Sequence, residues 1–329
     1  MDFALSDEQV LVRDTARGLL ARHCPITLVR AAIDEPAAAD PLWVQLREWT
    51  VIGDGSLVDL CLFVEECGAA LAPGPYLPTA AFALPLLRAA GADDDADAIA
   101  AGERTATVAL AGEDGQWVAN DDPVKTFVLE ADRVDLVVFV DAAGGLRIGE
   151  SVAEPRRVGS LDIVRRYFEA PVPAAAPVAI VADVDAWLRR ATVTLAAEML
   201  GTARWLNQAA IAYAKERVQF DVPIGSFQAI QHKLADASLA YERAWSAVYY
   251  AAMCIDAADA DAARATHVAK AAAGAAATRA AKDSIQVHGG IGYTWEHDLH
   301  LYLRRAYASE HLLGTSAWHH DRLADLLFA

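Results

Sequence analysis

The sequence of 329 residues is poor in cysteine and in basic residues, and it lacks long apolar runs. Its four cysteines form no C-x-x-C pair and are too sparse for a disulfide framework or a zinc site, so we expect reduced thiols in a reducing compartment. The apolar runs fall short of the roughly 20 residues that a membrane-spanning helix requires. Acidic residues stand where a secretory signal has basic ones, which favours a cytoplasmic location.

The balance of charges narrows the classes of partner. Lysine and arginine number 28 against 45 aspartates and glutamates, so the net charge is −17. Because nucleic acids and anionic membranes require a basic surface, we expect neither as the main partner. A polyanionic ligand such as a nucleotide would need a local positive site against this field. Hydrophobic residues make up 55% of the chain, which is typical of a globular protein with a sizeable core.

Three segments with different residue patterns follow one another. Up to residue 104 the apolar residues recur at helical spacing, and Ser6 with Gln9 predicts a capping box at the first helix. Residues 105–177 contain short β-branched runs bounded by Gly, Asp and Pro, which predict a small antiparallel β-domain. Four long helical patterns in residues 178–329 predict a four-helix bundle. The expected fold is therefore mainly α, with an N-terminal helical domain, a middle β-domain and a C-terminal bundle.

The element boundaries follow from the same patterns. The expected helices cover 7–22, 42–49, 56–71, 79–90, 184–217, 226–258, 262–288 and 298–329, the last broken at Gly314. The expected strands cover 105–111, 126–129, 136–140 and 146–148. A run rich in proline and alanine at 171–177 is predicted to be the linker into the bundle.

Two motifs in the predicted bundle contain residues suited to binding phosphate groups. Arg217 ends a long helix and can pair with a phosphate, or it can satisfy the last carbonyls of its own helix. Phe220 can pack against an aromatic ring or fill core, and Gln228 lies near a helix start, where backbone amides favour anions. Gly289 and Gly290 allow a ligand to approach the backbone, although the same glycines can cap a helix.

These motifs carry a family resemblance. Residues 217–228 read R-V-Q-F-D-V-P-I-G-S-F-Q and resemble the R-x-x-F-x-x-P-I-x-x-F-Q element of acyl-CoA dehydrogenases. Residues 286–296 read Q-V-H-G-G-I-G-Y-T-W-E and resemble the family's Q-x-x-G-G-x-G-Y-T-x-E element. The resemblance implies an acyl-CoA substrate, an oligomer, and FAD held largely across a subunit interface. The residues that it assigns to the FAD diphosphate and adenosine are Arg217, Phe220, Gln228, Gln286, Gly289 and Gly290.

The catalytic carboxylate of the family is missing. Members of the family remove the Cα proton of an acyl thioester with a glutamate, and most of them place it where this chain has Leu313. Thr315 nearby is kept and can contact the cofactor. A second group of members places the base on the first bundle helix, where this chain has Ala191. Glu198 is either a packing residue or a displaced base.

The middle segment is also reduced relative to the family. In place of the phrases that contact the flavin ring and the substrate it has 109–115, A-L-A-G-E-D-G, and Thr126-Phe127. The chain therefore resembles the shorter, base-lacking subunit of bacterial heterotetrameric acyl-CoA dehydrogenases, notably those acting on steroid side-chain thioesters. In such an assembly a longer partner subunit supplies the carboxylate. No motif specifies the acyl group.

Other interpretations remain open. The chain can be a non-catalytic helical assembly partner, or an active homo-oligomer that uses an unconventional base such as Glu198 or Glu296. Histidines gather near the C-terminus, but their spacing does not predict a metal site. These histidines are His288, His297, His300, His311, His319 and His320.

Overall fold

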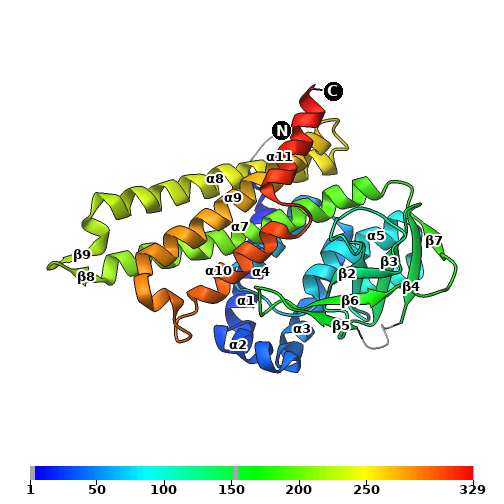
Figure 1. Cartoon of the computed structure of the whole chain (residues 1–329), viewed down its shortest axis with the longest axis horizontal. Helices are drawn as coiled ribbons and strands as arrows, with labels where there is room; N and C mark the ends of the chain where they lie inside the picture. Colours follow the sequence, from blue (N-terminus) through cyan, green and yellow to red (C-terminus); the bar gives the residue numbers. More distant parts are fainter. Residues whose placement is uncertain (1–3, 151–154, 329) are drawn as a thin grey trace. The chain divides into compact units, whose positions relative to one another are not determined.

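The computed structural model describes residues 4–150 and 155–328, which form long helices and short strands (Figure 1). They divide into two compact units, which we call the bundle unit and the mixed unit. The bundle unit is built from 1–21, 61–72 and 192–329, and the mixed unit from 22–60 and 73–191. Within the described ranges, no helix combines the length and the apolar character of a membrane span.

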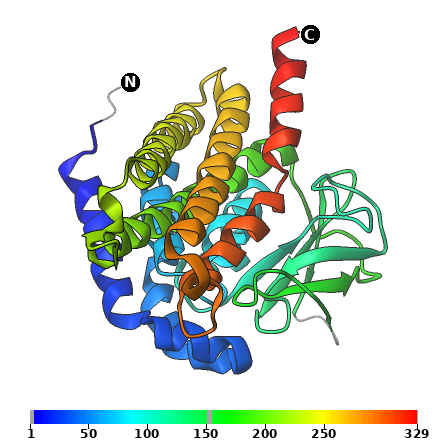
Figure 2. The same ribbon diagram turned by 60° about the vertical axis from the view of Figure 1, so that its left-hand side comes forward.

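The bundle unit contains the long C-terminal helices, which confirm the predicted bundle. They are α7 (Val184–Glu216, whose first turns belong to the mixed unit), α8 (Gln228–Asp256), α9 (Ala262–His288), α10 (Leu299–His311) and α11 (Ser316–Phe328). Seen from two directions, α8 and α9 lie side by side along their length (Figures 1 and 2). Gly314 separates α10 from α11 with a φ of +96°, a conformation that glycine adopts without strain.

Parts of α1 (Asp7–His23) and α4 (Leu57–Ala69) complete the bundle unit. The capping box predicted at α1 is confirmed, because the backbone amides of Ser6 and Gln9 donate to each other's side chains at 3.1 and 3.2 Å. A Cβ atom at Gly68 of α4 would lie 2.0 Å from the carbonyl oxygen of Glu198, and one at Gly201 would lie 1.8 Å from that of Glu65. These two glycines therefore bring the backbones of α4 and α7 into direct contact.

A buried charge network lies beside this crossing. Both carboxylates of the Glu65–Glu66 pair on α4 contact Arg204 of α7, at 3.2 and 2.7 Å. Tyr241 and Tyr249 of α8 donate their hydroxyl protons to Glu65 at 2.8 and 2.9 Å. Burial raises the pKa of Glu65, although Arg204 and the two hydroxyls favour its charged form. The network ties α4, α7 and α8 together, and pairing is what makes buried carboxylates tolerable.

The mixed unit begins with short helices. They are α2 (Ile26–Asp34), α3 (Asp40–Leu46), a 3₁₀ helix (Arg47–Asp54), a π-helix (Leu77–Ala83), α5 (Leu84–Ala89) and α6 (Asp93–Ala100). The helix predicted over 79–90 begins as the π-helix, because Pro85 has no amide hydrogen for the regular bond to residue 81. The sequence patterns missed α2 and α6, although three aspartates in the first turn of α6 suit a helix N-terminus.

Two small sheets form the β-part of the mixed unit. Their strands are β1 (Ala106–Ala109), β2 (Val124–Leu129), β3 (Leu136–Val140), β4 (Gly145–Gly149), β5 (Arg156–Val158), β6 (Tyr167–Pro171) and β7 (Ala179–Ile180). The sheets have the orders β1-β3-β4-β7 and β2-β6-β5, with a shared core that includes Val128, Phe139 and Phe168.

The β-domain is confirmed, with one difference in strand direction. The prediction is antiparallel throughout, whereas β1 pairs with β3 in parallel and in the register Ala106 to Leu136. The chain between these strands passes through β2 in the other sheet, and a crossover of that kind is what a parallel pair requires. The domain boundaries predicted at residues 104 and 177 stay a prediction.

Candidate functional site

The two motifs singled out in the sequence meet at one end of the bundle unit. Tyr213 near the end of α7 stacks on His288 at the end of α9, with ring centroids 4.4 Å apart. Ala214 and Val287 are buried in the same cluster, against which Ile224 packs. Burial lowers the pKa of His288. The end of α7, the start of α8 and the end of α9 therefore form one surface, which we call the motif end.

A tight hairpin projects from the motif end. Strands β8 (Val218–Gln219) and β9 (Val222–Pro223) pair through a two-residue turn at Phe220 and Asp221. Both turn residues have positive φ angles, +54° and +62°, as a type I′ turn requires. Aspartate tolerates this region, but phenylalanine is strained there. The Phe220 side chain is 87% exposed and meets Phe227 edge-on at 6.2 Å. It is presented outward and does not fill the core.

Arg217 lies between α7 and this hairpin. Its amide donates to the Tyr213 carbonyl at 2.8 Å, and its carbonyl accepts a hydrogen bond from the Ile224 amide at 2.8 Å. Its guanidinium is exposed and makes no hydrogen bond or ion pair with any described residue. The side chain therefore does not satisfy the last carbonyls of α7, and its five donors stay available to an anion.

The glutamines and glycines of the motifs are open in the same way. Gln228 begins α8, Gln286 lies in the last turn of α9, and both are exposed. Gly289 ends α9 with a φ of +64°. A Cβ atom at Gly289 or Gly290 would meet nothing within 4 Å, so the backbone here is accessible from outside. The motif end thus offers amide, guanidinium and backbone donors on a single surface.

The loop that contains Leu313 is buried, in contrast to the exposed motif end. Leu312 and Leu313 are buried, and Leu313 has a left-handed φ of +56°. Lys270 of α9 donates through Nζ to the carbonyls of Glu310 and Gly314, at 3.1 and 2.7 Å. Burial lowers the pKa of Lys270 to about 8, against the attraction of Glu310. The position of the usual catalytic base is therefore an apolar plug.

Histidines fix the same loop from the side of α11. His319 lies with Nε2 3.0 Å from the Leu313 carbonyl and donates to it, so its Nδ1 accepts from His267 at 2.8 Å. Burial lowers the pKa of His319 to about 3, and the charge of Lys270 adds to this effect. Thr315 accepts the Trp318 amide through Oγ1 at 3.1 Å. Its hydroxyl caps α11 in this arrangement.

The other carboxylates considered as catalytic bases, Glu198 and Glu296, lie outside the Leu313 loop. Glu198 is buried and forms an ion pair with Arg305 of α10, at 3.2 Å. Ala191, at the alternative base position, is fully buried, and Glu296 is exposed. The ion pair links α7 to α10, and removal of either partner would leave an uncompensated buried charge. A catalytic role for Glu198 stays a prediction.

Sequence reasoning missed Lys270 and the charge network of α4. The available signal for Lys270 was a lysine flanked by alanines in the middle of α9, where a long side chain can extend past its small neighbours. In the part of the chain that the structure describes, no three His, Cys, Asp or Glu residues are arranged to hold a metal ion. The four cysteines are buried and free of disulfides.

Comparison with known proteins gives consistent matches. The family model for the acyl-CoA dehydrogenase C-terminal domain matches residues 184–328. The acyl-CoA dehydrogenase IpdE2 of Mycobacterium tuberculosis is 34% identical over 322 residues, which cover 93% of each chain. Among solved structures, a variant of the Tcur3481–Tcur3483 steroid acyl-CoA dehydrogenase (ACAD) has a TM-score of 0.87 at 25% identity over 98% of both chains. The ChsE4–ChsE5 complex of Mycobacterium tuberculosis has a TM-score of 0.84 at 22% identity over 99% of both chains.

Proposed function

Since this chain belongs to the acyl-CoA dehydrogenase family, whose members are oxidoreductases that act on CH–CH bonds, we propose that it is one subunit of an FAD-dependent heteromeric enzyme. In this proposal the chain contributes FAD contacts across a subunit interface. A longer acyl-CoA dehydrogenase subunit supplies the carboxylate that removes the Cα proton of an acyl-CoA thioester. The observation that carries the proposal is the contrast between the open motif end and the sealed Leu313 loop.

The residues of the motif end fit the phosphate and adenosine parts of FAD. When bound, FAD accepts the hydride that leaves Cβ of the acyl group. Arg217 would pair with the diphosphate, because a guanidinium without a partner forms bidentate bonds to phosphate. Phe220 would pack on an aromatic ring, and the open backbone at Gly289 and Gly290 would allow close approach. Gln228 and Gln286 would donate amide hydrogens beside them, and Thr315 is the further residue that we assign to the cofactor.

A partner subunit is needed to complete such a site. The assigned residues lie on an exposed surface, so this chain forms one wall of the cofactor site and not an enclosure. No carboxylate occupies position 313 or position 191. The ChsE4–ChsE5 complex and the Tcur3481–Tcur3483 steroid ACAD carry names with two components. These names support a second kind of subunit, and the name of the Tcur3481–Tcur3483 protein supports a steroid acyl thioester as the substrate.

The test compares the lone chain with a co-expressed complex. The chain is purified alone and together with a longer acyl-CoA dehydrogenase subunit, and the flavin absorbance and the dehydrogenase rate are measured for each. We expect flavin and turnover in the complex and little turnover from the lone chain. Flavin in neither preparation would favour a non-catalytic assembly partner. Robust turnover by the lone chain would favour a homo-oligomer, with Glu198 and Glu296 as the bases to mutate.

Arg217→Ala tests the assignment of the cofactor residues within that complex. A charge-assisted hydrogen bond contributes about 1.5–3 kcal/mol, so FAD should bind about 10 to 100 times more weakly to the complex that contains this variant. Lys215→Ala is the matched control, because Lys215 is a second exposed cation at the end of α7. Equal flavin content in the two variants would exclude Arg217 from the site.

A further inference from the structure

One ring contact joins the two motifs of the motif end. His288 is the last residue of α9 and directly precedes Gly289, whereas Tyr213 lies on α7 one turn before Arg217. The two rings stack with centroids 4.4 Å apart and an angle of 25° between their planes. The Arg217 amide donates to the Tyr213 carbonyl at 2.8 Å. The separation between Arg217 and the backbone at Gly289 therefore depends on this stack.

The His288 ring is held in one orientation. Its side chain is buried, and Nδ1 lies 2.8 Å from the carbonyl oxygen of Ser284, one turn earlier in α9. Because a carbonyl oxygen only accepts, Nδ1 carries a hydrogen and donates it there. His297 meets the same ring edge-on at 4.8 Å. A Cβ atom at Gly292 would lie 3.2 Å from the His288 Cβ, so the chain after α9 folds back closely on this residue.

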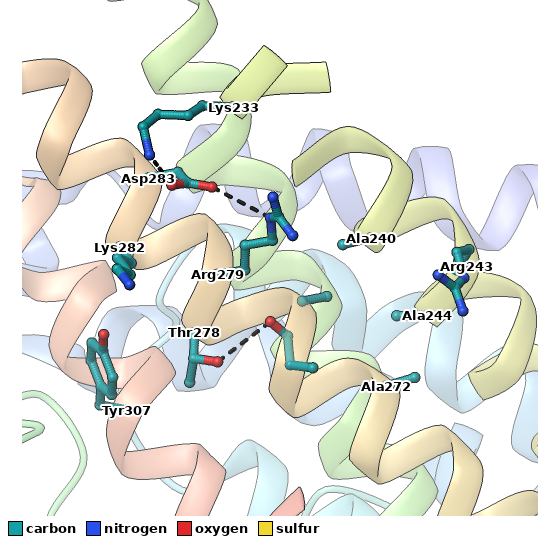
Figure 3. Close-up of a pocket in the computed structure, with 12 residues that line it drawn as sticks. Lys233, Ala240, Arg243, Ala244, Ala272, Thr278, Arg279, Lys282, Asp283 and Tyr307 are labelled. Carbon is teal, nitrogen blue, oxygen red and sulfur yellow. Dashed lines mark hydrogen bonds and ion pairs between the residues drawn. The ribbon is translucent and has the colours of Figure 1, made fainter. Parts of the chain in front are cut away.

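A second link connects the end of α9 to the start of α8 (Figure 3). Asp283 of α9 accepts from Lys233 of α8 at 3.3 Å and pairs with Arg279 of its own helix at 3.4 Å. The Lys233 side chain is 41% exposed. Ion pairs with an exposed partner contribute little, because water screens them and long side chains lose freedom. The buried stack on Tyr213 therefore fixes the end of α9 more firmly than this ion pair.

We propose that His288 is a positioning residue for the cofactor: its ring, stacked on Tyr213, sets the separation between the two motifs. This inference rests on the proposed function and adds to it a residue that acts on the cofactor site through Tyr213. A ligand held from two helix ends binds tightly only when the ends are already placed, since ordering them on binding costs free energy. Loss of the ring should thus weaken FAD binding without removing a group assigned to contact FAD.

A direct contact with the diphosphate is the alternative role for this histidine. A protonated imidazole has a second N–H, which attracts an anion. Burial lowers the pKa of His288 from its ordinary value of 6.5, and the neighbouring His297 acts in the same direction. The other titratable group that faces the ring is Tyr213, and the α8 residues in this cluster, Ile230 and Leu234, carry no charge. The ring is therefore neutral at neutral pH, which suits a buried stack.

The first experiment titrates the flavin-free co-expressed complex with FAD and follows flavin fluorescence. His288→Ala removes the ring and should raise the dissociation constant of FAD on the order of tenfold. His288→Asn keeps a polar side chain without the imidazole ring and should behave in the same way. His288→Phe keeps a ring that stacks on Tyr213 and should stay within about threefold of the wild type. A phenylalanine variant as weak as the alanine variant would overturn the stacking role.

Two control variants separate positioning from a general loss of stability. Lys233→Ala removes the ion pair with Asp283 and should change the FAD affinity by less than about twofold. Tyr249→Phe removes a hydroxyl from the buried Glu65, about 30 Å along α8 from its start. It should destabilise the bundle unit without changing FAD affinity. Equal weakening of FAD binding by Tyr249→Phe and His288→Ala would refute positioning.

The pH dependence separates positioning from direct contact. Protonation places a charge on the buried His288 ring, so the stack should be lost as the pH falls below 6.5 towards the lowered pKa. FAD should therefore bind the wild-type complex more weakly at about pH 5 than at about pH 7.5, and His288→Phe should show a smaller change. Tighter binding at acid pH in the wild type alone would mean that the imidazolium donates to the diphosphate, and positioning would be wrong.

Failure of this inference differs from failure of the proposed function. A complex that binds FAD equally well with every substitution at His288 would refute the positioning role and leave the proposed function intact. A wild-type complex that binds no FAD at either pH would refute the proposed function and, with it, the role of His288.

Discussion

Two residues of the bundle unit share an unusual backbone conformation in opposite surroundings. Phe220 at the motif end has a φ of +54° and is 87% exposed, whereas Leu313 in the loop after α10 has a φ of +56° and is 5% exposed. A left-handed conformation costs such residues roughly 1–2 kcal/mol. Leu313 is held in it by burial and by hydrogen bonds from Lys270 and His319, while Phe220 is held by a two-residue hairpin.

The difference distinguishes an exposed surface, the motif end, from a buried loop whose contacts are made within the chain. Strain persists where the surrounding structure over-determines it. Within the chain the Phe220 ring meets Phe227 edge-on, yet the side chain stays 87% exposed. At Leu313 the protein itself fills the space, and the Leu313 carbonyl accepts a hydrogen bond from His319. In the proposed function, the surface that we assign to the cofactor is therefore exposed, and the position of the usual catalytic base is buried.

The largest effect on stability is expected when a carboxylate is introduced at position 313. Leu313→Glu places an acid in an apolar, buried position, which should lower the free energy of unfolding by about 3 kcal/mol or more. We expect no dehydrogenase activity from the lone variant. Chemical denaturation and an activity assay check both statements.

Leu313→Met is the matched control for that substitution. It keeps the volume and the apolar character, so its cost should stay below about 1.5 kcal/mol. Turnover by the lone Leu313→Glu chain would mean that the loop can open to substrate, and the plug described here would then be wrong.

Removing the Lys270 ammonium group, which anchors the Leu313 loop, should have the next largest effect on the free energy of unfolding. Lys270→Met keeps the aliphatic stem but leaves the carbonyls of Glu310 and Gly314 without their donor. We expect a loss of about 2 kcal/mol in the free energy of unfolding, as is usual for buried polar groups left unsatisfied. Lys282→Met on the same helix is exposed and should change stability by less than about 0.5 kcal/mol. Equal effects of the two substitutions would show that Lys270 anchors nothing.

The sequence was sufficient to predict the long helices because the helical spacing of their apolar residues is repeated many times. The range predicted for the third bundle helix, 262–288, is the range of α9, and residues 136–140 were placed correctly as β3. Short elements without a repeated period were missed, among them the edge strands β5 and β7. The parallel pairing of β1 with β3 depends on a crossover between two sheets, which no local pattern encodes.

The candidate site, too, could be predicted only in part from the sequence. The motif residues were found because glycines and charged or aromatic residues at fixed spacing are visible in one sequence, and the structure brings Arg217 and Gly289 to one end of the bundle unit. The seal at Leu313 was visible only as a missing glutamate. Its cause lies in Lys270 and His319, which are distant in sequence and become neighbours only through packing.

Acidification should loosen the sealed loop through His319. The pKa of His319 is lowered to about 3 from an ordinary value of 6.5. A group with a depressed native pKa contributes stability that is present above 6.5 and lost as the pH falls towards 3. The unfolding free energy of the wild type should therefore fall more steeply below pH 6.5 than that of His319→Gln. Parallel pH profiles of the two proteins would show that His319 is not buried as a neutral group.

The smallest expected effect on stability is at the exposed turn. Phe220→Gly relieves the left-handed backbone and removes an outward side chain, so the free energy of unfolding of the lone chain should change by no more than about 1 kcal/mol. The flavin content of the co-expressed complex should nevertheless fall, because the ring that we assign to the cofactor is gone. Phe220→Tyr keeps the ring and should retain flavin. A stable Phe220→Gly complex with full flavin content would show that the strained turn serves some other contact.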